Sequence, residues 1–175
     1  MASILSIGEI RGLNENSNVV TVPSGHTLNI GTRSLEASTP YLVAYAAYTN
    51  SVSSSTWASL GSWSTSNDTH SWFSASTGRY TPQIAGWYLV SAARRHGYSG
   101  VGESGQHYIA VFKNGNNVGE PAGFSQGSGG YPSWWVHKTV FLNGTTDYVE
   151  MKMYDSVAQS NVGGVLESVL IREAE

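Results

Sequence analysis

The chain contains no cysteine, and only 12% of its 175 residues are charged. Without cysteine it forms no disulfides, thiolate zinc sites or thiol nucleophiles, so packing, hydrogen bonding or oligomerisation must stabilise it. An average domain is about 25% charged. The low charge is typical of a chain that buries much of its surface in subunit contacts, or that binds sugars or proteins. A monomer with a Ser/Thr-rich polar face is the alternative.

Basic stripes and long apolar runs are also missing. The formal net charge is -3, and the basic residues form no stripe longer than Arg94–Arg95, so we expect no nucleic-acid partner. No apolar run approaches the roughly 20 residues of a membrane span, and MASILSIGEIRG lacks the basic start and apolar centre of a signal peptide. These absences predict a soluble protein that is made in the cytoplasm and does not insert into a membrane.

Motifs for catalysis and metal binding are absent as well. The five histidines form no H-x-H or H-E-x-x-H pair, and the aspartates form no Asp-x-Asp cluster. GVGESG (100–105) has G-x-G-x-x-G spacing, but the strand-like QHYIAVFK follows it where a dinucleotide site needs a helix. The carboxylates sit in no glycosidase motif. We therefore expect no enzyme, no metal site and no cofactor.

Short apolar runs separated by Gly, Asn and Ser clusters, with almost no helical periodicity, predict an all-β chain. In DYVEMKMYD, Val149, Met151 and Met153 alternate with Glu150 and Lys152, which predicts one face in a core and one in water. The clearest runs are YLVAYAAY (41–48), WYLVSAA (87–93), HYIAVFK (107–113), HKTVFL (137–142), YVEMKMY (148–154) and GVLESVLIR (164–172).

Turn residues divide these runs. KNGN (113–116) and LNGT (142–145) each contain Asn-Gly, which tolerates positive φ and closes turns between strands. Gly86, just before a tryptophan, predicts a bulge or a close backbone approach at the start of a strand. Pro82 should lie outside the ladder because it cannot donate a hydrogen bond.

The strand that follows Gly86 has two distinct faces. Trp87 and Leu89 should lie opposite Tyr88 and Val90, so that one face fills a sandwich and the other meets a neighbouring sheet or subunit. The serine-rich segment 49–77 and the glycine-rich segments 97–105 and 123–130 are expected to be exposed loops.

Residues 1–38 differ from the rest, and we predict that they form an arm joined to a head of residues 39–175. Three interpretations of the arm stay open: a disordered leading segment, an extra hairpin on the head, or an anchor that becomes ordered when it binds another subunit. The regular spacing of its apolar residues favours the last two. The apolar residues that would anchor it are Ile4, Leu5, Ile7, Ile10 and Leu13.

Four segments of the head together resemble the complement globular-head, tumour-necrosis-factor-like jelly-roll family. They carry an aromatic-Ser-Thr-Gly lead, a Gly-aromatic-Tyr strand, a Lys-Asn-Gly turn, an Asp-Tyr-Val junction and a closing Gly-rich strand. The segments are FSASTGRYTPQIAGWYLVSAA, HYIAVFKNGNNV, HKTVFLNGTTDYVEMKMYDS and GGVLESVLIREAE. The resemblance covers about residues 40 to 175 and implies an antiparallel jelly-roll β-sandwich that assembles as a homotrimer.

In such a trimer, aromatic residues of the strands pack between subunits. The resemblance makes the following tyrosines candidates for the subunit interface: Tyr41, Tyr45, Tyr88, Tyr108 and Tyr154. A second aromatic group, Tyr131, Trp134 and Trp135 in GGYPSWWVHK, is a candidate ligand-binding loop that stacks on sugars or anchors a protein. The alternative is packing, with Trp135 turned inward and Trp134 shielding the edge of the core.

The arm segment NVVTVPSGHTLNIG is similar to segments of bacteriophage tail-fibre and virion surface proteins, notably in phages of cyanobacteria. The collagen-like stalk of animal members is absent, which speaks against a complement or adipokine role. The two resemblances imply a trimeric phage protein on the virion surface, made in the host cytoplasm. A chain with its own Met1, a short arm and one head is expected to be a capsid decoration protein bound to the major capsid protein.

Two other functions stay open. One is a receptor-binding knob on a tail-fibre shaft or tailspike that holds a host surface glycan. The other is a secreted trimeric ligand of the same fold. The missing signal peptide and stalk argue against this function.

Overall fold

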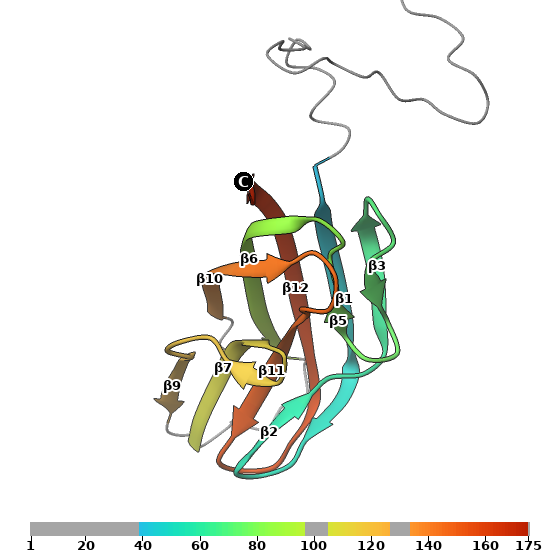
Figure 1. Ribbon diagram of the computed structural model, residues 1–175. Coiled ribbons are helices and arrows are strands. Elements are labelled where there is room, and N and C mark those ends of the chain that lie inside the picture. The colour runs from blue at the N-terminus through green and yellow to red at the C-terminus, as the bar shows by residue number, and fades with distance from the viewer. Residues whose placement is uncertain (1–38, 97–104, 127–133, 175) are drawn as a thin grey trace, which may run out of the picture. The chain divides into compact units, whose positions relative to one another are not determined.

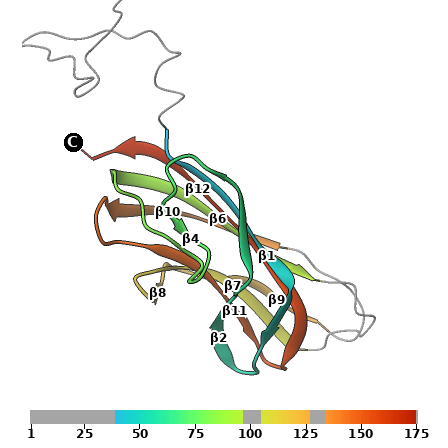
Figure 2. The same ribbon diagram turned by 90° about the vertical axis from the view of Figure 1, so that its right-hand side faces the viewer.

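A computed structural model describes residues 39–96, 105–126 and 134–174 of the chain. These residues form strands and no helix, so across these ranges there is no helix long and apolar enough to cross a membrane. The strands make two antiparallel sheets that pack face to face, as Figure 1 shows from one side and Figure 2 after a quarter turn. The predicted all-β sandwich is confirmed.

The first sheet has five strands, in the order β10-β6-β12-β1-β3. Every pairing in it is antiparallel. Four of its strands cover runs that the sequence predicts as strands, although each is longer than predicted. The bounds are β1 Tyr41–Val52, β3 Trp63–Asp68, β6 Ala85–His96, β10 Trp134–Asn143 and β12 Gln159–Glu173.

The second sheet has six strands, in the order β4-β5-β11-β7-β8, with β9 also paired to β7. The short strand β2 lies against β11. The bounds are β2 Thr56–Ser59, β4 Phe73–Ser74, β5 Arg79–Tyr80, β7 Gly105–Lys113, β8 Asn116–Asn117, β9 Ala122–Gln126 and β11 Val149–Asp155. The turn between β7 and β8 is the predicted Asn-Gly, with φ of 51° at Asn114 and 80° at Gly115.

The core lies between the sheets, and alternation along each strand fills it. In β6, Tyr88 and Val90 are fully buried while Trp87 and Leu89 point outward and are more than a third exposed. This confirms the two faces predicted for the strand. Val149, Met151 and Met153 likewise supply the buried face of β11.

Gly86 marks a close backbone approach, as predicted. A Cβ atom at this position would collide with the carbonyl oxygen of Arg172 and would lie 2.7 Å from Cδ1 of Leu170. The pairing of β12 with β6 shifts register between Leu170 and Arg172, so a bulge in β12 faces the glycine. Pro82 lies between β5 and β6, outside the ladder, as expected.

Two sequence predictions are wrong in part. The segment 49–77 is not a set of loops, because it contains the end of β1 and the strands β2 to β4, with Trp63 in the core. The segment 123–130 contributes its first residues to β9.

Glu150 is also not in water, although its place in the alternation predicts that it should be. It is buried because charged neighbours gather around it: its carboxylate lies 3.5 Å from Arg79 Nε and 3.4 Å from Lys152 Nζ.

The chain divides into two units, Met1–Ala37 and Ser38–Glu175. The predicted anchoring arm, including its five apolar residues, lies outside the described residues. Of the glycine-rich segment 97–105, residues 97–104 also lie outside the described residues, whereas Gly105 is the first residue of β7 and not part of a loop.

We predict that Gly86→Ala destabilises the head by about 1–3 kcal/mol, because the added methyl group forces the bulge of β12 away from β6. The midpoint of urea unfolding measures this change. Gly61→Ala is the matched control, since the nearest heavy atom to its new Cβ is 3.6 Å away, and its effect should stay within about 0.5 kcal/mol. Equal midpoints for the two variants would contradict the close approach.

Candidate functional site

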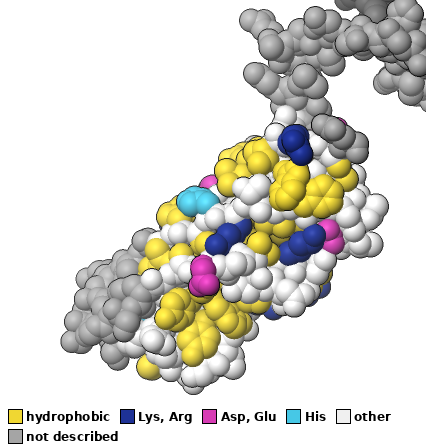
Figure 3. Space-filling view, turned by 60° about the vertical axis from the view of Figure 1, so that its left-hand side comes forward, with side chains coloured by type: hydrophobic (Ala, Val, Ile, Leu, Met, Phe, Trp, Pro, Cys, Tyr) yellow, Lys and Arg dark blue, Asp and Glu magenta, His cyan; other side chains and the backbone are white. Residues whose placement is uncertain are grey.

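The outer face of the five-stranded sheet, which points away from the core, is unusually apolar. Strands of this sheet carry eight of the ten large exposed hydrophobic side chains in the described part of the chain. The eight are Tyr41, Tyr45, Tyr48, Trp87, Leu89, Trp135, Phe141 and Ile171. Figure 3 shows a side of the molecule where apolar side chains form several clusters, with Lys, Arg, Asp and Glu side chains between them.

The sheet register arranges the outer face in rows. Leu89 lies beside Val169, which pairs on its other side with Tyr41. At one end of the face, Trp87 pairs with Phe141, and their ring centroids are 5.6 Å apart. Neighbouring strands thus place large apolar side chains next to one another, and this row of apolar residues runs across several strands of the sheet.

A polar row interrupts this apolar face. Ser91 stands between Glu167 and His137, and its hydroxyl oxygen is 2.8 Å from His137 Nδ1. Activation of a serine needs the histidine between the serine and the acid. The row has the serine in the middle, so it lacks the geometry of a catalytic triad.

A shallow hollow of about 340 Å³ lies beside this row. Tyr45, Trp135 and Val165 supply its apolar lining, and Arg95 and Glu167 contribute opposite charges. Its size and mixed lining suit a side chain from another protein surface.

The five tyrosines proposed for the subunit interface lie in three places. Tyr41 and Tyr45 are on the outer face of the five-stranded sheet. Tyr108 and Tyr154 are half-buried on the outer face of the six-stranded sheet, where they pair across β7 and β11. Tyr88 lies in the core between the sheets.

The environment of Tyr88 is that of a structural core residue. Its hydroxyl donates to the carbonyl oxygen of Ile84 at 2.9 Å. Burial raises the pKa of Tyr88 to about 12, and the charge of Glu173 adds to the effect. Burial also raises the pKa of Tyr80, whose ring centroid is 6.3 Å from that of Tyr88. Both phenols therefore stay neutral around pH 7 and face the core instead of a partner.

Trp134 and Trp135, from the candidate ligand-binding loop, are the first two residues of β10 and point to opposite faces. Trp134 packs against the core, and its Nε1 donates to the carbonyl oxygen of Ala122 at 3.2 Å. Trp135 is 45% exposed on the outer face of the five-stranded sheet. The packing alternative, which turned Trp135 inward, is wrong for this residue. Tyr131 lies outside the described residues.

A buried ionic cluster joins the two sheets, and the sequence analysis missed it. Arg94 Nη1 lies 2.5 Å from Asp155 Oδ1, and His107 Nδ1 donates to the same oxygen at 2.6 Å. All three side chains are fully buried, and the Arg94 guanidinium lies 5.4 Å from the centroid of the Trp134 ring. Arg94 comes from the five-stranded sheet and the other two ionic residues come from the six-stranded sheet.

This cluster could have been predicted from the alternation of side chains between the two faces of each strand. Arg94 is an even number of residues from Tyr88 and Val90, so it shares their inward face. The same spacing joins His107 to Ile109, and Asp155 to Met153. Three inward polar residues at strand ends must pair with one another, because isolated buried charges are costly.

Two antiparallel sheets with these strand orders form a jelly-roll β-sandwich of the tumour-necrosis-factor-like type. The globular domain of zebrafish complement 1qA protein superposes with a TM-score of 0.61, and the match covers 78% of this chain and 99% of that one at 13% identity. The PRD1 vertex protein P5 gives a TM-score of 0.59 and 12% identity, with 75% of this chain and 96% of that one covered. Murine APRIL gives 0.53 and 15%, with 75% and 99% covered.

At these identities, the likeness shows the fold alone. No protein-family model matches the chain, and no curated protein matches it.

We predict that Arg94→Met destabilises the head by about 3–5 kcal/mol, because it leaves Asp155 buried without its cationic partner. The midpoint of chemical unfolding measures this loss. Lys113→Met is the matched control: it removes a cation of the six-stranded sheet from a partly exposed ion pair with Asp147, so its replacement should change stability by less than about 1 kcal/mol. An Arg94→Met variant as stable as the control would contradict a structural role for the cluster.

Proposed function

We propose that the chain is a structural protein of a phage virion surface, a capsid decoration protein whose heads assemble as a homotrimer through the outer face of the five-stranded sheet. The role requires no catalysis. Burial of matching apolar surfaces around a threefold axis supplies the stability, and a trimer on the capsid stabilises the lattice by binding the assembled state.

The observation that carries this proposal is the apolar outer face. Soluble monomers rarely expose continuous apolar patches larger than a few hundred Å², and larger patches mark interaction surfaces. Here the aromatic pair Trp87 and Phe141 and the central Leu89 lie on one side of a single sheet. Apolar surface of this kind contributes roughly 25 cal/mol for each Å² removed from water.

The hollow beside the polar row supports a contact between identical heads. In a ring of identical subunits, one patch of each head meets a different patch of the next. A protruding aromatic side chain of one head fits the recess formed by Tyr45, Trp135 and Val165. Arg95 and Glu167 supply opposite charges that fix the register of the contact.

Support for the virion surface comes from two likenesses. The fold is shared with the PRD1 vertex protein P5, and the arm segment NVVTVPSGHTLNIG has the resemblance to phage surface proteins noted in the sequence analysis. The fold is equally shared with complement and APRIL domains, so the arm carries the choice of a phage protein. Residues 1–38 would bind the major capsid protein.

A receptor-binding knob on a fibre shaft is the second candidate. It is favoured by a pocket on the outer face of the six-stranded sheet, lined by the aromatic residues Trp57, Tyr108 and Tyr154. This pocket stays accessible when subunits cover the five-stranded sheet. This candidate shares the trimer with the decoration protein and differs in the partner of the arm and in the need for a ligand.

We predict that the native chain has, by light scattering behind a sizing column, three times the mass of one 18.7 kDa chain. Leu89→Glu should convert it to a folded monomer, because the substitution places a charge in the middle of the apolar face. Val157→Glu is the matched control, since Val157 is also an exposed apolar residue but lies between β11 and β12, outside both sheets. A monomeric native chain, or a trimeric Leu89→Glu variant, would refute this interface.

Capsids assembled without the protein test its location. The full chain should bind them, and residues 38–175 should fail to bind while keeping the mass of a trimer. Binding is measured by co-sedimentation with the capsids. If the full chain, as a trimer, does not bind capsids, the decoration role is wrong and the knob takes its place.

A further inference from the structure

A small pocket lies on the outer face of the six-stranded sheet, away from the apolar face of the other sheet. It is open to solvent and has a volume of about 220 Å³. The residues that line it come from β2, β7, β11 and the segment before β9; they are Trp57, Gln106, Tyr108, Pro121 and Tyr154. Aromatic side chains from three strands that are distant in sequence therefore meet around one cavity.

The aromatic rings of the pocket are held by one another. Tyr108 and Tyr154 pair directly across β7 and β11, with ring centroids 5.9 Å apart. The indole of Trp57 lies 5.7 Å from the Tyr154 ring and 5.3 Å from the ring of Phe112. Such edge and tilted contacts restrict the rings, so a ligand meets a surface that is already formed.

A glycine on the neighbouring strand fixes one wall of the pocket. Gly123 in β9 pairs with Tyr108, and a Cβ atom at Gly123 would collide with Cδ1 of the tyrosine ring. The ring of Tyr108 therefore packs directly on the backbone of Gly123. Any larger residue at position 123 would push this ring out of place.

The pocket combines apolar surface with neutral hydrogen-bonding groups. Trp57 is 36% exposed, which leaves much of a large indole in contact with water. The phenol hydroxyls of Tyr108 and Tyr154 each donate and accept, and the exposed amide of Gln106 offers two donors and an acceptor. A ligand that matches this set must have an apolar face and several hydroxyl groups.

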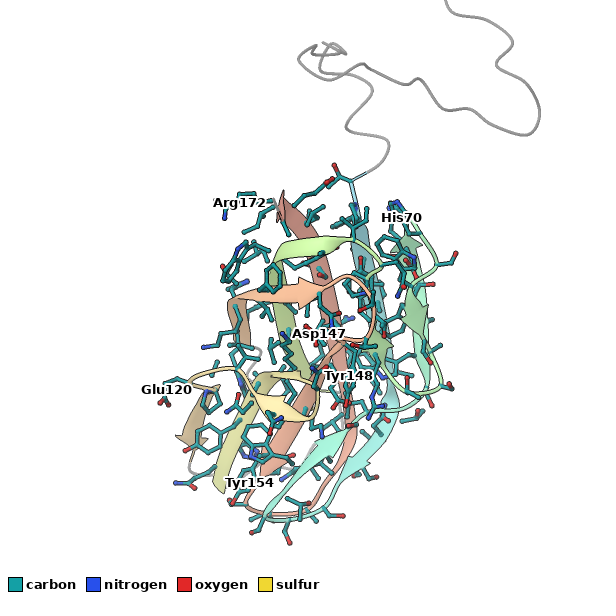
Figure 4. The ribbon with its side chains drawn as sticks, in the orientation of Figure 1. His70, Glu120, Asp147, Tyr148, Tyr154 and Arg172 are labelled. Atoms are coloured by element: carbon teal, nitrogen blue, oxygen red, sulfur yellow. The ribbon has the colours of Figure 1, made fainter. Side chains whose placement is uncertain are left out.

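None of the residues that line the pocket is charged. The nearby ammonium of Lys152 lies 4.9 Å over the Phe112 ring and 3.4 Å from the carboxylate of Glu150, so its charge is already compensated. Glu120, next to Pro121, projects outward from the edge of the molecule (Figure 4). The site consequently suits a neutral ligand better than an anion or a cation.

From this chemistry we infer that the pocket binds one ring of a neutral saccharide. The C–H face of a pyranose would pack on the indole of Trp57 and the ring of Tyr154 through dispersion and apolar burial. Its hydroxyls would bond to Gln106 and to the phenol of Tyr108. The pocket is open, and its volume of about 220 Å³ is smaller than most sites for drug-sized ligands, so it suits a single sugar ring.

The position of the pocket agrees with recognition of an external glycan. The start of β1 and the end of β12 lie together, since the amide of Leu170 donates to the carbonyl oxygen of Pro40 at 3.1 Å. Tyr154 is at the other end of the head, as Figure 4 shows for Tyr154 and Arg172. The pocket is formed within one subunit, so the inference goes beyond the proposed trimer and does not depend on it.

The test is saturation-transfer difference NMR on the full chain with methyl glycosides of glucose, galactose, mannose, fucose and N-acetylglucosamine, and with the acidic sugar N-acetylneuraminic acid. At least one neutral glycoside should bind, with a dissociation constant on the order of 1 mM for a ligand of this size. The acidic sugar should bind at least tenfold more weakly. If no neutral glycoside binds, or only the acidic sugar does, the inference is wrong.

Variants locate the binding site. Trp57→Ala should weaken binding of the selected glycoside at least tenfold, and Gln106→Ala, which changes only an exposed side chain, should weaken it about threefold to tenfold. Trp135→Ala is the control, because it removes another exposed tryptophan from the opposite sheet. Unchanged binding in both pocket variants, or a loss only in Trp135→Ala, would overturn this site.

The same samples separate this inference from the proposed function. The mass of each variant is measured by light scattering, and its fold by circular dichroism. A trimer without saccharide binding refutes the pocket and leaves the proposed assembly intact. A monomer that binds the saccharide refutes the assembly and leaves the pocket intact.

Discussion

The constraint on which the rest of the structure depends is that one sheet is apolar on both faces. Alternation along β6 places Tyr88 and Val90 in the core and Trp87 and Leu89 on the outer face. The five-stranded sheet therefore exposes apolar side chains on its outer face, which is unfavourable in water. A sandwich covers only one face of each sheet. The second face of this sheet is therefore the surface through which we propose that identical heads meet around an axis.

The six-stranded sheet solves a different problem, because its outer face stays in solvent. Here Lys152 and Glu150 compensate one another beside the aromatic rings, and Trp57 from β2 covers part of Phe112. At one end, the Arg94–Asp155 contact fastens this sheet to its partner. A buried ion pair adds little stability over apolar packing, but its directional bonds fix how the two sheets meet. The two proposals use the two sheets separately: the outer face of the five-stranded sheet for assembly and the pocket on the six-stranded sheet for binding a ligand.

The sequence predicts the fold well where alternation and turn chemistry act together. The core face of β11 and the Asn114-Gly115 turn are local properties, and both are confirmed. The strands β2 and β3 were missed because their serines and threonines are exposed and imitate a loop. Glu150 was misplaced because its burial depends on Arg79, a residue 71 positions away in sequence.

The functional surfaces were harder to predict for the same reason. Tyrosines were grouped by residue type, whereas the structure sorts Tyr41, Tyr88 and Tyr108 onto an outer face, the core and the opposite outer face. Sequence alone gives the parity within each strand but not which sheet a strand joins. The contact between Trp57 and Tyr154 shows the difference: it exists only because β2 lies against β11. A pocket assembled from several strands is a property of the topology, so it can be recognised only once the position of each strand in the sheets is known.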